Sequence, residues 1–127
     1  MLGIVYLRQG RYEEAIAEYQ KGVDLSGRAS SYLRDLGYGY GVWGRRTEAV
    51  AIIKELEQKY ARQETHAREI AEVYSGLGDK DQAFAWLEKD FRARSTSLPA
   101  ITIDSTFEPL RNDPRYADLL RRMGLRS

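Results

Sequence analysis

Few residues in this chain could carry out chemistry. His66 is the only histidine and there is no cysteine, so a metal site built from these ligands has no second member. A Ser-His-Asp arrangement would need His66 to act from the start of a helix, without an exposed nucleophile turn. The carboxylates are spread along polar helix faces, and no pair is set apart in an apolar pocket for acid–base work. We therefore expect no catalytic residue, no metal and no cofactor, and His66 reads as a surface residue.

The glycine-rich stretch GYGYGVWG, at 37–44, invites comparison with a phosphate-binding loop. It lacks the Lys-Ser/Thr pair of a P-loop, and no strand precedes it. Close packing between helices, with Gly44 ending one helix, explains the glycine-rich stretch better than a phosphate-binding loop does. Gly39 and Gly41 have no such role, and each should cost about 1 kcal/mol of helix propensity relative to Ala.

Composition narrows the class of partner. The chain has 127 residues, 43% apolar and 31% charged, with a formal net charge of +1. Basic pairs such as Arg45-Arg46 and Arg121-Arg122 are mixed with acidic residues, so neither nucleic acid nor a membrane surface is an expected partner. No apolar run approaches the ~20 residues of a membrane span, and the first residues do not form a signal peptide. The default location is cytoplasmic.

The chain repeats itself with a period of 34 residues, and three copies hold the same residue types at six positions. The copies are Leu2, Gly3, Tyr6, Gly10, Ala15 and Tyr19; Leu36, Gly37, Tyr40, Gly44, Ala49 and Ile53; and Ile70, Ala71, Tyr74, Gly78, Ala83 and Leu87. Each copy reads as helix, tight turn and helix, because apolar residues recur at three- and four-residue steps and Gly ends the first helix. Stacked copies can bury apolar faces that one pair would leave exposed.

This pattern predicts an all-α fold. The expected helices are 1–9, 12–25, 31–43, 46–62, 64–77, 79–94 and 114–123, with a helical turn or two within 104–111. Ser30 or Ser31 is the expected N-cap of the third helix, Asp79 of the sixth and Asp113, followed by Pro114, of the last. A loop rich in hydroxyls surrounds Pro99. Asp90 is out of place, since close packing is expected there, and it should either partly face water or pair with a neighbouring Arg.

The segment LGIVYLRQGRYEEAIAEYQKGVDL resembles the tetratricopeptide repeat, and the same frame covers roughly residues 2–94. The resemblance implies an α-α superhelix of three helix-turn-helix repeats (1–27, 28–61 and 62–95), followed by a C-terminal loop and capping helix at 96–127. It also implies a non-enzymatic module for protein–protein or peptide interaction. About six positions of the first unit are missing before Met1. We therefore expect a piece of a longer protein, or an apolar edge that a second copy could cover as a homo-oligomer.

The tail resembles the end of tetratricopeptide segments in bacterial signalling proteins, most specifically in FEPLRNDPRY at 107–116. Phe107, Leu110, Tyr116, Leu119 and Leu120 should cover the third repeat. This resemblance implies an alternative role, as the regulatory C-terminal domain of a kinase, cyclase or transcription regulator that contacts its own effector domain.

In this family the first helix of each pair lines the concave groove. The positions that map to it include Arg8, Arg34, Tyr38, Gly41, Arg68 and Glu72, together with Ile4, Leu7, Ser31, Thr65 and Ser75. Arg34 and Arg68 could hold an acidic group of a peptide beside Tyr38, or both could simply be solvated. Gly41 could leave room for a partner's side chain. The Asn positions of the carboxylate-clamp version are Ile4, Tyr38 and Glu72 here, which argues against chaperone C-termini as partners.

Overall fold

The computed structural model describes residues 2–93 and 105–124, and within them the chain forms α-helices and one 3-10 helix without any strand. The elements, in chain order, are α1 (Leu2–Arg8), α2 (Tyr12–Leu25), α3 (Ser30–Val42), α4 (Arg46–Ala61), α5 (Ala67–Leu77), α6 (Lys80–Arg92), η2 (Ser105–Leu110) and α7 (Pro114–Arg122). The predicted helix positions are confirmed, with ends that differ by up to three residues. The loop predicted around Pro99 lies outside the described residues.

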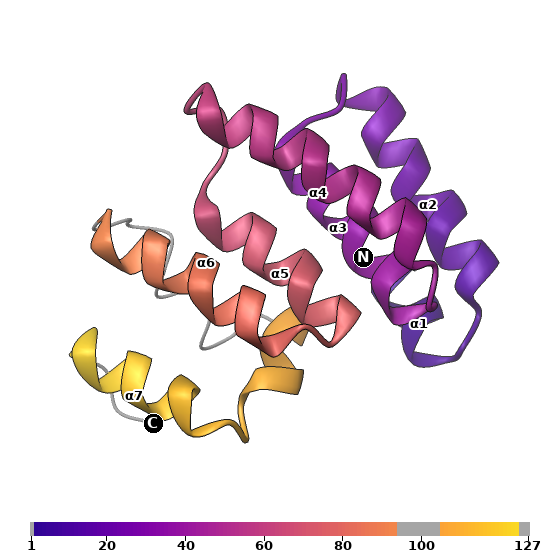
Figure 1. Ribbon diagram of the computed structural model, residues 1–127. Coiled ribbons are helices and arrows are strands. Elements are labelled where there is room, and N and C mark those ends of the chain that lie inside the picture. Colours follow the sequence, from indigo (N-terminus) through magenta and orange to yellow (C-terminus); the bar gives the residue numbers. More distant parts are fainter. Residues whose placement is uncertain (1, 94–104, 125–127) are drawn as a thin grey trace.

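The six helices α1–α6 form three consecutive pairs that pack side by side (Figure 1). Gly10, Gly44 and Gly78 stand in the turns within the pairs, each with φ between 73° and 81°, a left-handed conformation that a side chain would strain. Ala15, Ala49 and Ala83 follow early in the second helices and have no exposed surface. The repeat positions thus set the turns and place a small, buried residue early in each second helix.

The N-caps of α3, α6 and α7 can be compared with the predicted ones. Asp79 accepts a hydrogen bond from the backbone N–H of Gln82 (3.2 Å), and Asp113 accepts one from that of Arg115 (2.9 Å), so both predicted caps are confirmed. The prediction of a Ser cap for α3 is wrong. Its N-cap is Ala29, whose backbone N–H donates to Ser26 Oγ (3.1 Å) instead.

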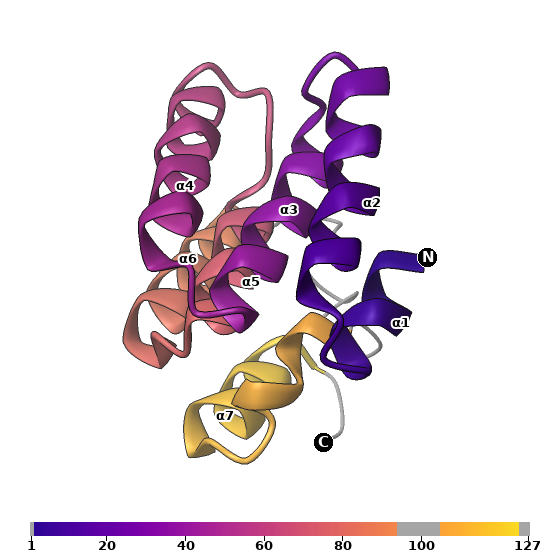
Figure 2. The ribbon, with the colours of Figure 1, turned by 90° about the vertical axis from the view of Figure 1, so that its right-hand side faces the viewer.

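The C-terminal elements close one end of the array. In Figures 1 and 2, α7 lies beyond α6, at the end of the molecule away from α2. The five apolar side chains expected to form the cap are buried in one cluster with those of α3 to α6; they are Phe107, Leu110, Tyr116, Leu119 and Leu120. Burial of this size stabilises by roughly 1.5–3 kcal/mol per large side chain, so η2 and α7 are integral to the core.

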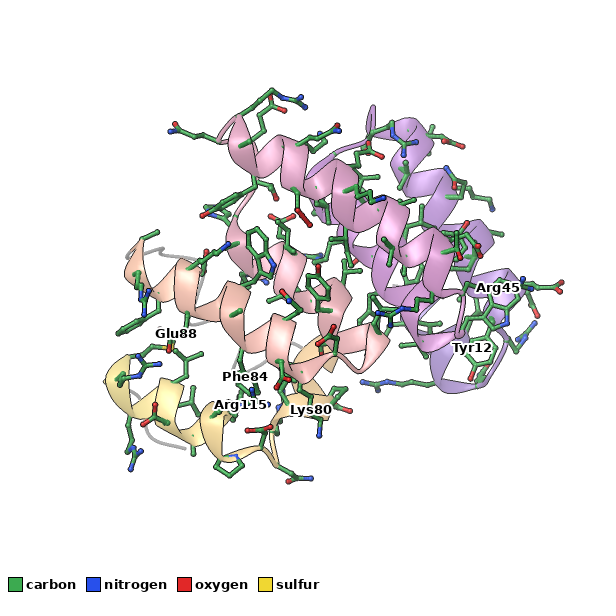
Figure 3. The ribbon with its side chains drawn as sticks, in the orientation of Figure 1. Tyr12, Arg45, Lys80, Phe84, Glu88 and Arg115 are labelled. Carbon is green, nitrogen blue, oxygen red and sulfur yellow. The ribbon has the colours of Figure 1, made fainter. Side chains whose placement is uncertain are left out.

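Arg115 fastens α7 to α6. Its guanidinium lies 4.6 Å from the centroid of the Phe84 ring and donates to Asp81 (2.8 Å), as Figure 3 lets the reader follow from the labelled Arg115 and Phe84. The same guanidinium bonds Asp113 and, with the backbone N–H of Arg115, lowers the pKa of that carboxyl to about 2. Asp113 therefore keeps its charge as the cap of α7 down to strongly acidic pH.

No helix in the described ranges is both long enough and apolar enough to cross a membrane.

Candidate functional site

The residues predicted to line a groove lie on α1, α3 and α5, the first helices of the three pairs, and we call the surface that these helices form the first-helix face. Arg8 belongs to α1, Arg34, Tyr38 and Gly41 to α3, and Arg68 and Glu72 to α5. Helices α3 and α5 pack directly against each other, which brings the α3 and α5 members together.

Arg34, Arg68 and Glu72 form an internal ion network. The carboxylate of Glu72 has no exposed surface and lies 2.9 Å from Arg68 Nη1 and 3.5 Å from Arg34 Nη1. Arg34 also pairs with Asp35 at 3.1 Å, and the two Arg side chains are only 19% and 12% exposed. The expectation of two open cations awaiting an acidic peptide is therefore not met, because carboxylates of the chain itself already compensate both charges.

The electrostatics agree with the geometry of this network. Burial by itself would lower the pKa of Arg34, but the negative charges of Glu72 and Asp35 outweigh burial, so that the pKa is raised. The Glu72 carboxylate on α5 attracts the Arg34 guanidinium across the contact between α3 and α5 and the Arg68 guanidinium on its own helix. The network thus has a structural role in joining two neighbouring pairs.

Gly41 does not leave room for a partner, and that prediction is wrong. A Cβ at Gly41 would lie 2.8 Å from the backbone carbonyl carbon of Gly76 and from the backbone nitrogen of Leu77. At Gly76, a Cβ would lie 2.9 Å from the backbone oxygen of Tyr38. The two helices therefore cross in direct backbone contact, and the two glycines are what allows it.

Gly39 is also accounted for by packing. A Cβ there would lie 3.0 Å from Ile16 Cδ1 and from Tyr19 Cε2 on α2. The glycines that the repeat frame leaves unexplained thus let α3 approach one neighbour on each side, α2 through Gly39 and α5 through Gly41.

An open part of the first-helix face remains between α1, α3 and η2. This hollow of about 210 Å³, the α1–α3 hollow, is lined by Ile4, Leu7, Arg8, Tyr38, Val42 and Glu108. Leu7 and Tyr38 are buried, whereas Val42 is 38% exposed. Arg8 and Glu108 face each other at 4.0 Å, with side chains 65% and 60% exposed, so they contribute little to stability and are free to adjust.

Two of the predicted residues, Arg8 and Tyr38, therefore belong to an open site, together with Ile4 and Leu7. Sequence reasoning missed Val42 and Glu108. Val42 lies four residues after Tyr38 on the same helix, and this spacing could have revealed it. Glu108 lies on η2, and no pattern in the repeats indicates that this segment reaches α1.

The other residues that mapped to the groove are divided between surface and interior. Ser31 is exposed, whereas Ser75 is 1% exposed and lies inside the array. His66 is exposed at the N-cap of α5, as the sequence predicts. In the described part of the chain, no group of three or more His, Asp and Glu side chains could hold a metal ion.

Paired helices stacked into an array, with glycine at each tight turn and a closing helix at one end, define an all-α helical-repeat protein. Residues 1–29 match the family model of the tetratricopeptide repeat, and the all-α array of helix pairs is consistent with a tetratricopeptide repeat array. No curated protein and no solved structure matches the chain. Tetratricopeptide repeats generally mediate interactions between proteins.

Proposed function

We propose that this chain is a non-enzymatic interaction module that binds a partner protein or peptide through the α1–α3 hollow of the first-helix face. The observation that supports it is the composition of the hollow. Its floor is apolar, with Leu7, Tyr38 and the half-exposed Val42, and its rim carries one charge of each sign, Arg8 and Glu108. An apolar floor within a polar rim suits one apolar anchor residue of a peptide, with the rim contacting polar groups around it.

The proposed site is smaller than the groove expected from the sequence. Phe107 and Leu110 of η2 are fully buried, and η2 packs on α5, so the chain's own C-terminal segment covers part of the face. The partner therefore binds beside η2 and contacts Glu108. In the alternative regulatory role, the effector domain of a longer protein would bind to this same surface.

Selection from a displayed random-peptide library with the full chain tests the proposal. We expect the selected peptides to share an apolar anchor and to lose at least about tenfold in affinity when Val42→Asp places a charge in the floor. Val42 is exposed, so this variant should fold.

Leu25→Asp is the matched control. It makes the same chemical change on α2 at a side chain 89% exposed and outside the hollow, and it should leave peptide affinity unchanged. Selected peptides that bind Val42→Asp as tightly as the parent chain would contradict the proposal.

A further inference from the structure

A second surface lies at the turns between α3 and α4 and between α5 and α6. We call it the turn surface and define it by three exposed cations, Arg45, Arg46 and Lys80. Figure 3 labels Arg45 at the turn that follows α3, and Lys80 near Arg115. None of the three cations lines the α1–α3 hollow, so the proposed function makes no use of them.

Arg45 is held against a pair of aromatic rings. Its guanidinium lies 4.3 Å from the centroid of the Trp43 ring, and Trp43 stacks on Tyr12 of the preceding helix pair with 6.1 Å between the ring centroids. A guanidinium that lies over a ring keeps its N–H donors at the edge of its own plane, where a carboxylate can accept two of them. Arg45 therefore presents its donors in a defined orientation.

The repeat supplies an internal comparison for Arg45. Thirty-four residues earlier stands Arg11, which donates through Nε to Glu14 at 2.9 Å. The second copy keeps the same spacing in Arg45 and Glu48, but neither side chain forms an ion pair within the described residues. The Arg45 guanidinium lies on Trp43 instead. Arg45 thus keeps available the donors that Arg11 uses within its own helix.

The neighbouring turn adds the other two cations of the turn surface. Arg46 and Lys80 line one hollow of about 450 Å³, together with Asp79, Asp81 and Arg115. Asp79 caps α6, and Asp81 accepts a hydrogen bond from Arg115 at 2.8 Å. Arg46 and Lys80 form no ion pair within the described residues. Three cations face two carboxylates in the described lining, so the hollow has an excess of positive charge.

We propose that the turn surface binds an acidic segment of a partner protein, whose carboxylates contact Arg45, Arg46 and Lys80. Cations that have no carboxylate partner in their own chain complement such a segment. The three cations extend from one turn to the next, which suits several carboxylates along an extended segment. They are few for a nucleic acid, because proteins that bind one neutralise about 6–10 phosphates.

Titration of the ¹⁵N-labelled full chain with a blocked hexapeptide of glutamate, followed by amide chemical shifts, tests the proposal. We expect saturable shifts at residues 43–48 and 78–81, with a Kd on the order of 0.1–1 mM at low ionic strength. The hexapeptide of glutamine, which has a similar shape and no charge, should shift the same amides at least about tenfold more weakly.

The double variant Arg45→Gln with Arg46→Gln should raise the Kd of the glutamate peptide about tenfold or more. The matched control is Arg121→Gln with Arg122→Gln, which removes the same net charge at the other Arg-Arg pair, on α7. It should leave the Kd within about twofold, which separates a local site from the overall charge of the chain.

The thermal midpoint shows whether a loss of binding comes from unfolding. Arg45 and Arg46 are exposed and form no ion pair within the described residues, so their double variant should keep a midpoint close to that of the parent chain. Lys80→Gln is a second, milder variant, and it should raise the Kd about threefold.

Four results would overturn the proposal. They are the absence of saturable shifts at the two turns, equal binding of the glutamine peptide, an equal loss of affinity in the two double variants, and an unchanged Kd in the variant at positions 45 and 46. Displacement of the glutamate peptide by a lower concentration of a single-stranded hexanucleotide would assign the surface to nucleic acid instead. These outcomes are independent of peptide binding at Val42.

Discussion

Helix α5 carries two buried carboxylates three residues apart, and their surroundings differ. Glu72 lies between Arg68 and Arg34, at 2.9 and 3.5 Å, within the contact with α3. Glu69 lines a hollow of about 760 Å³ where the end of α4, the start of α5 and the end of α6 meet, and its Oε2 has no hydrogen-bond partner among the described residues. Residue type, helix and burial are nearly the same, so the difference lies in the neighbouring elements alone.

One helix thus carries both a paired carboxylate and a carboxylate with an unpartnered oxygen. On the side of α5 that faces α3, Gly41 and Gly76 let the two helix backbones approach directly. The Glu72 carboxylate on this side is paired with Arg68. On the other side, Glu69 Oε2 is buried and has no hydrogen-bond partner among the described residues. An oxygen left in this state has a cost in stability.

The largest loss of stability is expected from a substitution that disrupts the backbone contact between α3 and α5. In Gly41→Leu a branched side chain would start 2.8 Å from backbone atoms of Gly76 and Leu77, and backbone cannot move aside as a side-chain end can. We expect a loss of about 4 kcal/mol or more in the free energy of unfolding, measured by denaturant titration. Gly39→Ala, which meets only the ends of Ile16 and Tyr19, should cost much less. Equal losses would show that the backbone contact is not the constraint.

The next effect is expected at Leu56, which stands thirty-four residues before Asp90 in the repeat. Leu56→Asp gives this earlier position the residue type of the later one. Leu56 is fully buried in the main cluster, so an isolated carboxylate there should cost about 3–4 kcal/mol. Calorimetric unfolding measures it. A loss below about 1 kcal/mol would mean that positions 56 and 90 tolerate a buried carboxylate equally.

A smaller effect is expected from the ion network. Glu72→Gln keeps the shape of the side chain but leaves Arg34 and Arg68 with less negative charge between them. Both Arg side chains keep some exposure, so we expect a loss of about 2–3 kcal/mol in denaturant unfolding. Stability equal to that of the parent chain would show that solvent already screens the two guanidiniums.

The sequence alone predicts most of the fold. The 34-residue period places the turn glycines and the buried alanines, and the bounds of α2 agree with the prediction at both ends. The five capping side chains from Phe107 to Leu120 are expected from the resemblance of the tail to the ends of tetratricopeptide segments, and all five are buried.

The candidate sites are less predictable from the sequence, because the role of each residue depends on which residues of neighbouring helices it contacts. Gly41 owes its role to Gly76 on another helix, and Arg34 meets Glu72 only because α3 packs on α5. The pair Arg68 and Glu72 has the four-residue spacing of a helical ion pair, a signal that sequence reasoning missed. Asp90 stood out as unusual, but the expectation that it partly faces water is wrong, since it is 2% exposed.

The most direct test is the unfolding free energy of Glu69→Gln beside that of Glu72→Gln, in denaturant and without ligand. We expect Glu69→Gln to stay within about 0.5 kcal/mol of the parent chain, or to gain stability, because no hydrogen bond to Oε2 is lost. Glu72→Gln should show the larger loss given above. If Glu69→Gln loses as much as Glu72→Gln, both carboxylates are structural, and the contrast between the two sides of α5 fails.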